Sequence, residues 1–330
     1  MRRRIAALQL FIVIIELLIV VVPALAQQQK PVRVIGWLWY GSSPAGALPS
    51  IESAIIEGLR ELGYSEGRNL KLEHRFAKGR PEHLSELAQD LARQNVDVIV
   101  ALGGDLTAAV KKATATIPIV MGSSEDPVRA SLVASLARPG GNVTGVTFLS
   151  NELAGKRVEL LKEIDSKISR LAVLWNPAHY DEEFTEIQNV ARALDIKVQS
   201  LGLQRLNELD NTLAALTKEP PQAVVVVPSR LTSVARSQIA ATAIKLRIPV
   251  ISGWREFAEG GATASYGPDR TVMARRMAHY IDRVLKGAKP ADLPVERPTK
   301  FEFVINLQTA NQIGVTIPQR VLARADRVIR

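Results

Sequence analysis

The sequence predicts an α/β protein with two lobes, each built on a parallel sheet covered by helices. From Val32 onward, apolar segments typical of strands alternate with amphipathic segments typical of helices. Strand segments such as 96–102 and 223–227 are largely apolar and β-branched, as in strands covered on both faces. A chain of 330 residues is too long for one small core, and the alternation starts afresh at Arg170, so we expect a second lobe.

The elements of the first half follow from these patterns in order. Strands are predicted over 32–38, 70–76, 96–102, 117–121 and 143–147. Helices are predicted over 51–62, 81–94, from 106 onward, and over 127–136 and 151–164. Gly63 closes the first helix, and the spacing of Leu84, Ala88 and Leu91 gives the second helix an apolar face.

The helix predicted over 127–136 lies at the centre of the first half. Asp126 is a suitable N-cap and Pro127 a suitable first helical residue. Four apolar residues recur at helical spacing: Val128, Leu132, Val133 and Leu136. Pro139-Gly140-Gly141 ends this helix before the next strand. We therefore expect residues 123–126 to lie between the carboxyl end of a strand and the start of a helix, where α/β sheets bind ligands.

The second half repeats the alternation. Strands are predicted over 170–174, 197–201, 223–227, 249–251, 262–266 and 301–307. Helices are predicted over 182–194, 206–218, 231–246, 271–286, 308–313 and 320–329, with a short helix before Gly260. The Pro-rich segment 290–298 indicates a linker between lobes.

Residues 1–26 have the features of a secretory signal peptide. Three Arg follow Met1, an apolar run covers 5–22, and Ala24-Leu25-Ala26 matches the A-x-A pattern of cleavage sites. The run is also about long enough to span a bilayer, so an uncleaved anchor is the alternative, although Glu16 within it favours cleavage. Because the chain has no Cys, it cannot carry the lipidated cysteine of a lipoprotein. We expect a periplasmic protein that is not a lipoprotein.

Composition excludes several kinds of chemistry. Without Cys there are no disulfides, thiolate nucleophiles or Cys-based metal sites, and the four His show no metal-ligand spacing. The net charge of +9 becomes +7 without residues 1–26, but the basic residues are dispersed and have no interleaved aromatics. We therefore expect no metal site and no nucleic-acid partner.

Motifs for enzymes and cofactors are also missing. No GxGxxG follows a strand, and neither GxxxxGK[ST] nor GxSxG occurs. Adjacent acids such as Glu125/Asp126 and Glu182/Glu183 lie at predicted helix starts, where acids usually cap the helix. The sequence predicts no catalytic residue and no cofactor.

Polar residues at strand ends form a coherent candidate site for a small ligand. They are Ser42, Ser43, Thr107, Ser123, Ser124, Asn176 and Ser229. Hydroxyls beside helix N-terminal amides suit a carboxylate or another anion. N-capping of the helices is the competing role for each Ser and Thr.

Aromatic and acidic residues complete this candidate site. Aromatic side chains that could stack on a ring are Trp39, Tyr40, Trp175, Trp254 and Tyr266. Acids that could bind an ammonium group are Glu125, Glu256 and Asp269, and Asp126 is a further candidate for the wall of the cleft. For the aromatics, packing at the lobe edges is the alternative.

Three long segments resemble one known family. DPVRASLVASLARPGGNVTGVTFLSNELAGKRVELLKE (126–163), KGAKPADLPVERPTKFEFVINLQTANQIGVTIP (286–318) and LRELGYSEGRNLKLEHRFAKGR (59–80) are similar to segments of an ABC-transporter substrate-binding protein family with the type I periplasmic-binding-protein fold. The resemblance implies two Rossmann-like lobes joined by a three-crossover hinge. It implies one lobe of residues 31–148 with 268–295 and another of 149–267 with 296–330.

The resemblance also implies a function. Such proteins bind a small solute in the cleft between the lobes and pass it to a membrane permease with its ATPase; relatives bind aromatic amino acids. We expect a monomeric solute receptor for an amino acid or similar carboxylate, possessing an aromatic or branched side chain. The alternatives are a sensor that presents its ligand-bound state to a membrane receptor and, less favoured, an exported enzyme.

Overall fold

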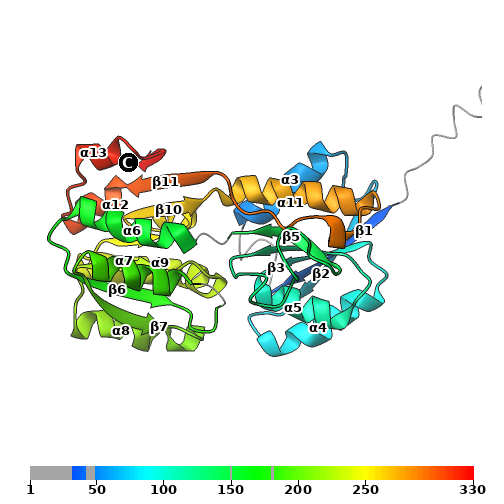
Figure 1. The fold of residues 1–330 in the computed structure, drawn as a ribbon, viewed down its shortest axis with the longest axis horizontal. Helices are drawn as coiled ribbons and strands as arrows, with labels where there is room; N and C mark the ends of the chain where they lie inside the picture. Colours follow the sequence, from blue (N-terminus) through cyan, green and yellow to red (C-terminus); the bar gives the residue numbers. More distant parts are fainter. Residues whose placement is uncertain (1–31, 42–48, 149–150, 180–181) are drawn as a thin grey trace, which may run out of the picture.

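The structure is a computed structural model that describes residues 32–41, 49–148, 151–179 and 182–330. The predicted signal segment and the candidates Ser42 and Ser43 lie outside the described residues. Two sheets lie side by side, each with helices on both faces (Figure 1). We call the sheet of β1–β5 with its helices lobe 1, and the sheet of β6–β12 with its helices lobe 2.

Lobe 1 is a parallel sheet with the strand order β2-β1-β3-β4-β5 among the described residues. Its strands are β1 (Arg33–Trp39), β2 (Leu70–Phe76), β3 (Val98–Leu102), β4 (Ile119–Ser123) and β5 (Val143–Thr147). Helices α3 (Pro49–Glu61) and α11 (Arg270–Leu285) pack together on one face. The other face carries η1 (Pro81–His83), α4 (Leu84–Arg93) and α5 (Gly104–Ala113).

Lobe 2 has the strand order β12-β11-β10-β9-β8-β6-β7 among the described residues. Its strands are β6 (Arg170–Trp175), β7 (Lys197–Gly202), β8 (Ala223–Val226), β9 (Val250–Ser252), β10 (Ala264–Pro268), β11 (Phe301–Asn306) and β12 (Arg327–Ile329). The expectation of an entirely parallel sheet is wrong at one place, because β10 and β11 pair antiparallel. The cause is topological: the chain leaves lobe 2 after β10 and re-enters it from the side facing lobe 1.

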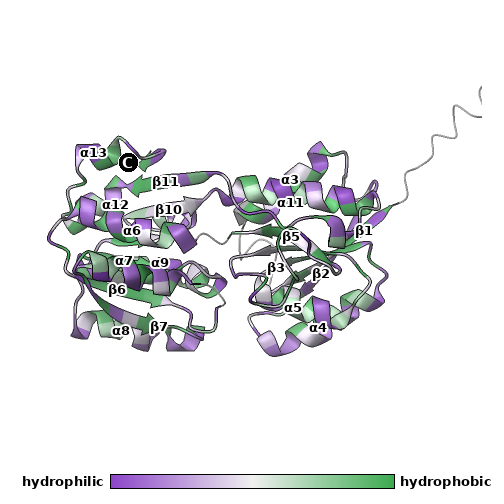
Figure 2. Ribbon diagram, in the orientation of Figure 1, coloured by the Kyte–Doolittle hydropathy of each residue, from purple (hydrophilic) through white to green (hydrophobic). Residues whose placement is uncertain are grey.

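Helices cover both faces of the second sheet. One face packs against α6 (Asn151–Ile164), α7 (Glu183–Ala193), α12 (Leu307–Ile313) and α13 (Gln319–Leu322). The other packs against α8 (Leu209–Lys218), α9 (Arg230–Leu246) and α10 (Arg255–Glu259), with η2 (Leu206–Glu208) before α8. The helices carry both hydrophobic and hydrophilic residues along their length (Figure 2), and their buried apolar residues pack against the sheets.

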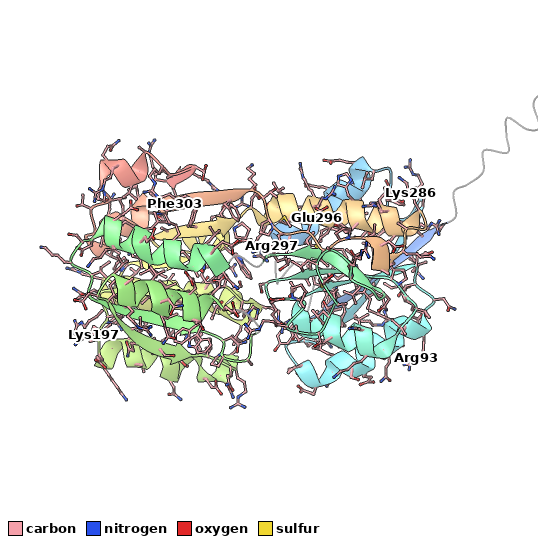
Figure 3. All side chains as sticks on the ribbon, viewed as in Figure 1. Arg93, Lys197, Lys286, Glu296, Arg297 and Phe303 are labelled. Atoms are coloured by element: carbon pink, nitrogen blue, oxygen red, sulfur yellow. The ribbon has the colours of Figure 1, made fainter. Side chains whose placement is uncertain are left out.

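The described segments of the chain are divided between the lobes by three passages. These lie between Phe148 and Asn151, between β10 and α11, and between Arg297 and β11. Near the third passage, Arg297 pairs with Glu152 at 2.9 Å, and Glu296 pairs with Arg276 at 2.6 Å. Figure 3 places Glu296 and Arg297 close to the junction of the lobes.

The predicted helix over 127–136 is wrong. The segment forms a single turn that starts at Asp126, whose Oδ1 accepts hydrogen bonds from Val128 N and Arg129 N. Ser131 has a φ of +55°, which interrupts a right-handed helix. Leu132 and Val133 are nonetheless buried in the lobe 1 core. The apolar spacing therefore reflects burial of an irregular segment.

Two other predictions at the C-terminal end need correction. The helix expected over 320–329 is only α13, and the chain then forms β12, which pairs with β11. The linker over 290–298 contains the short 3₁₀ helix η3 (Pro290–Asp292) and a bridge between Glu296 and Val146. Among the described residues, no helix combines the length and apolar character that a membrane span needs.

Candidate functional site

A cavity of about 250 Å³ lies between the lobes, at the carboxyl ends of strands from both sheets. From lobe 1 its lining is Tyr40, Pro81, Gly103, Gly104, Asp105, Ser124 and Glu125. From lobe 2 the polar part of the lining is Asn176, His179, Gln204, Ser229 and Arg230. This position is the one at which ligands bind in open α/β sheets.

The lobe 1 wall depends on two glycines, Gly103 and Gly104, at the start of α5. Gly103, with a φ of +134°, turns the chain from β3 directly into α5. A Cβ atom on Gly104 would lie 2.1 Å from Oε2 of Glu125, so the absence of a side chain there lets this carboxylate lie against the start of α5. Asp105 follows in the first turn of the helix and lines the cavity.

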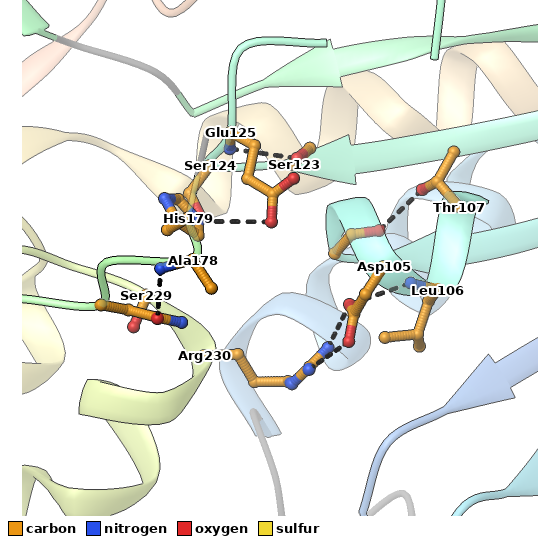
Figure 4. Close-up of polar contacts among 12 residues, drawn as sticks. Asp105, Leu106, Thr107, Ser123, Ser124, Glu125, Ala178, His179, Ser229 and Arg230 are labelled. Carbon is orange, nitrogen blue, oxygen red and sulfur yellow. Dashed lines mark hydrogen bonds and ion pairs between the residues drawn. The ribbon is translucent and has the colours of Figure 1, made fainter. Parts of the chain in front are cut away.

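The loop after β4 supplies the other part of this wall. The buried Ser123 hydroxyl accepts a hydrogen bond from Glu125 N at 3.1 Å and so fixes the loop. Ser124 Oγ lies 3.0 Å from Nε2 of His179, across the boundary between the lobes. Glu125 Oε1 lies 3.8 Å from the same nitrogen. The wall therefore meets lobe 2 through direct polar contacts (Figure 4).

The lobe 2 wall begins at the N-terminus of α9. Ser229 caps this helix, because its Oγ accepts a hydrogen bond from Thr232 N while Thr232 Oγ1 accepts one from Ser229 N. Asn176 orders the neighbouring loop, since its Oδ1 accepts a hydrogen bond from Ala178 N at 3.0 Å. These two polar residues thus hold Arg230 and His179 in the lining.

Arg230 is the central side chain of the cavity. It forms a two-pronged ion pair with Asp105, with N–O distances of 2.7 and 2.5 Å (Figure 4). Its guanidinium also lies 3.8 Å from the centre of the Tyr40 ring, in cation–π contact. Arg230 comes from lobe 2, whereas Asp105 and Tyr40 come from lobe 1, so one side chain joins both walls.

An apolar recess of about 60 Å³ adjoins the cavity behind Tyr40 and Arg230. Its apolar lining includes Leu38, Trp39, Leu102, Leu106 and Val234. Trp39 is fixed there by stacking on Trp37 and by donating its indole N–H to His74 Nδ1 at 2.9 Å. Burial lowers the pKa of His74, opposed by the charges of Glu66 and Glu73, which favours the neutral ring that can accept this bond.

The structure brings some of the sequence-based candidates together and separates others. Tyr40, Ser124, Glu125, Asn176 and Ser229 line the cavity, and Trp39 lines the recess. Eight described candidates lie outside both: Thr107, Ser123, Asp126, Trp175, Trp254, Glu256, Tyr266 and Asp269.

These eight side chains have local partners. Trp175 stacks on Phe184 and donates its indole N–H to Ser200 Oγ. Thr107 donates to Gly103 O, and Asp269 caps α11. Glu256 pairs with Arg270, on which Trp254 stacks. Tyr266 contacts the Phe303 ring edge-on, remote from the cavity.

Three ionisable side chains of the lining are additional to the sequence-based candidates: Asp105, His179 and Arg230. Asp105 follows a Gly-Gly pair at a strand end, and Arg230 follows the N-cap Ser229. A search of the first turn of each helix after a strand would have found both. Among the described residues, no group of three His, Asp or Glu could hold a metal ion.

Comparison with known proteins places this geometry in context. A family model described as ABC transporter substrate binding protein matches residues 44–329. A tyrosine-binding protein of Clostridioides difficile (strain R20291) is 28% identical over 274 residues, which cover 81% of this chain and 78% of that protein.

Two solved structures share the fold with a TM-score of 0.81. One is an ABC domain in complex with L-Trp from Streptococcus pneumoniae, and the other is a conserved domain protein from Vibrio cholerae. Each is 28% identical to this chain, and each alignment covers 90% of this chain and 99% of the other. A benzoate complex of a solute-binding protein from R. palustris, at 14% identity and a TM-score of 0.53, shares the fold alone.

Proposed function

This chain belongs to the family of ABC transporter substrate-binding proteins, and from that premise we propose that its ligand is a free amino acid with an aromatic or large apolar side chain. As a member of this family it is a solute-binding protein that works with a membrane permease. The cavity of about 250 Å³ is close to the lower limit of ligand pockets, ~300–1,000 Å³, and suits a single small solute.

The observation that carries the proposal is the opposition of charges across the cavity. Lobe 1 contributes the carboxylates of Asp105 and Glu125, and lobe 2 contributes the guanidinium of Arg230. A zwitterionic amino acid offers an ammonium group to the first wall and a carboxylate to the second. A sugar or a neutral amine cannot complement both walls.

The recess suits the ligand's side chain. Its lining is largely apolar, and the Tyr40 ring stands where the recess meets the cavity. Relatives that bind tyrosine and tryptophan are consistent with an aromatic occupant. We therefore assign the ligand contacts to Tyr40, Asp105, Ser124, Glu125, Asn176, His179, Ser229 and Arg230.

We further propose how the protein operates. The lobes close around the ligand about the three passages of the chain, and the closed form is presented to the permease and its ATPase. The protein acts as an exported monomer in the periplasm, without catalytic activity, and residues 1–26 direct its export.

Calorimetric titration of the purified protein with the twenty L-amino acids tests this function. Saturable heat is expected with at least one aromatic or large apolar amino acid. At a 100-fold excess over the dissociation constant, the ligand should stabilise the protein by about 2.7 kcal/mol. Binding only of solutes that lack either charge would contradict the proposal.

A further inference from the structure

A third and smaller cavity, besides the main cavity and the apolar recess, lies where the chain passes between the lobes. Its volume is about 40 Å³, and it shares Gly103, Ser124 and Arg230 with the main cavity. The far side of this inner cavity is formed by Phe148, Trp254 and Arg270. Phe148 precedes the first passage between the lobes, and Arg270 is the first residue of α11, directly after the second.

Arg270 lines the inner cavity although its charged side chain is almost completely buried. Its side chain is only 5% exposed, and its guanidinium stacks on the Trp254 ring at 3.8 Å and lies 5.4 Å from the centre of the Phe148 ring. NH1 donates to Glu256 Oε1 at 3.2 Å. The buried Nε–H has no hydrogen-bond partner among the described residues. A buried donor without a partner is costly, so a group that accepts its hydrogen bond would stabilise the site.

The charged side chains in the described lining of the inner cavity are both cations. The charged side chains among its described lining residues are Arg230 and Arg270, with no carboxylate. Burial lowers the pKa of Arg270; Glu256 opposes this effect, whereas the charges of Arg255 and Arg236 add to it. Arg270 pairs with Glu256 and Arg230 pairs with Asp105, but neither acid lines the inner cavity, so the two guanidinium groups are the charges that an anion in this cavity would meet.

Size and donor geometry restrict which anion fits. A cavity of about 40 Å³ has room for roughly three water molecules, and so for the two oxygens of one carboxylate. Guanidinium groups bind carboxylates through parallel hydrogen bonds, and the Ser124 hydroxyl adds a donor on the side of the main cavity.

We propose that the inner cavity is the subsite for the carboxylate of the ligand, bound by Arg270 together with Arg230 and Ser124. This assignment rests on the proposed function and deepens it, because it fixes the ligand's orientation. The carboxylate points toward the passages between the lobes, the ammonium group toward Asp105 and Glu125, and the side chain toward the apolar recess. The subsite thereby selects solutes with a free carboxylate.

Double variants that remove both members of an ion pair test the subsite, because no buried charge then loses its partner. Arg270→Met combined with Glu256→Gln removes both partners of the buried ion pair. The matched control is Arg255→Met with Glu302→Gln, a neighbouring part-buried pair that does not line the inner cavity. Thermal unfolding of both variants checks that the lobes remain folded.

The decisive measurement compares an acid with its amide. L-Tyrosine and L-tyrosinamide form the first ligand pair, and the tightest-binding amino acid of the calorimetric panel with its carboxamide forms the second. The original protein and the control should prefer the acid by roughly 100-fold, and the Arg270/Glu256 variant by less than about fivefold. Equal loss of affinity for acid and amide in that variant would overturn the subsite while leaving amino-acid binding intact.

A second measurement separates the subsite from the proposed function. Acetate, the probe of the carboxylate alone, should change the fluorescence of Trp254, which stacks on Arg270. The change should disappear in Trp254→Phe and in the Arg270/Glu256 variant. If no amino acid binds but this acetate response is found, the proposed function fails and the subsite stands. If neither acetate nor any amino acid binds, both are wrong.

Discussion

The two walls of the cavity are built by different means. In the lobe 1 wall, carboxylates lie close to a backbone without side chains. Gly103 and Gly104 let the carboxylates of Asp105 and Glu125 lie against the start of α5. The lobe 2 wall depends on a capped helix, in which Ser229 orders the first turn of α9 and Arg230 extends from it. One wall is acidic and compact, and the other carries a long cation.

This difference indicates which lobe holds its ligand-binding groups in place before the lobes close and which lobe adds its groups afterwards. The acids of lobe 1 are placed by main-chain geometry, so they change little when the lobes separate. The guanidinium of Arg230 has several rotatable bonds and reaches across to Asp105 and Tyr40. We infer that lobe 1 is the preformed half of the site and that lobe 2 completes it on closure.

The largest effect is expected from removing the cation of the lobe 2 wall. Arg230→Met should weaken binding of the amino-acid ligand by roughly 100-fold, since charge-assisted hydrogen bonds are lost. Calorimetric titration measures this, with Lys245→Met, an exposed cation on the same helix, as the control. If both variants bind equally well, Arg230 does not contact the ligand.

Adding one methyl group to the lobe 1 wall should have the next largest effect. In Gly104→Ala the new Cβ would overlap the Glu125 carboxylate and displace it, so affinity should fall about tenfold. Because the new Cβ would meet the end of a side chain, which can rotate aside, and not backbone, the free energy of unfolding should change by only about 1 kcal/mol. Gly141→Ala is the matched control, as its Cβ would meet no atom within 4 Å. Unchanged affinity in Gly104→Ala would show that the position of Glu125 is immaterial.

The pair that joins the walls should contribute modestly to stability. Asp105 and Arg230 side chains are 40% and 29% exposed, so solvent screens their attraction. A double-mutant cycle of Asp105→Asn and Arg230→Met, measured by chemical unfolding, should give a coupling of about 0.5–1 kcal/mol that decreases with added salt. A coupling that salt leaves unchanged would speak against an ion pair between the lobes.

The smallest effect is expected in how stability depends on pH, through His74, which holds Trp39 in the apolar recess. The pKa of His74 is lowered by burial, so below its ordinary value of 6.5 the unfolded chain takes up a proton that the folded protein resists. The free energy of unfolding should therefore fall as the pH falls from 7 to 5. His74→Gln, which can still accept from Trp39, should reduce this slope, whereas the exposed His279→Gln should retain it. Equal slopes in the two variants would exclude His74 as a source.

Much of the fold was predictable because buried parallel strands have a strong local signal. The strands over 70–76 and 143–147 match the prediction at both ends. The direction of β11 was not predictable, because an apolar run packs equally well in either direction. The helix expected over 127–136 failed because backbone groups bond elsewhere: Ala134 N donates to Pro139 O, and Leu136 O accepts from Val295 N. A hydrogen bond to residue 295 cannot be predicted from the spacing of apolar residues within 127–136.

The site was less predictable than the fold. Polar residues at strand ends correctly indicated the edge on which the cavity lies, as Ser124, Asn176 and Ser229 illustrate. The pairing of Asp105 with Arg230 joins residues 125 positions apart, and only the placement of the lobes brings them together. Trp254 was placed at the right strand end, but its ring faces Arg270 and the inner cavity.

The position of α11 has a consequence for how the protein is made. This helix follows most of lobe 2 in the sequence, yet it buries Met273, Met277, Tyr280 and Ile281 in the core of lobe 1. During synthesis, one face of the lobe 1 sheet therefore stays incompletely covered until residue 285 has emerged from the ribosome. At that stage lobe 2 still lacks β11 and β12. Neither core can be completed early. For a chain that we propose is exported, this order of synthesis delays folding until after a translocation machinery has had time to bind it.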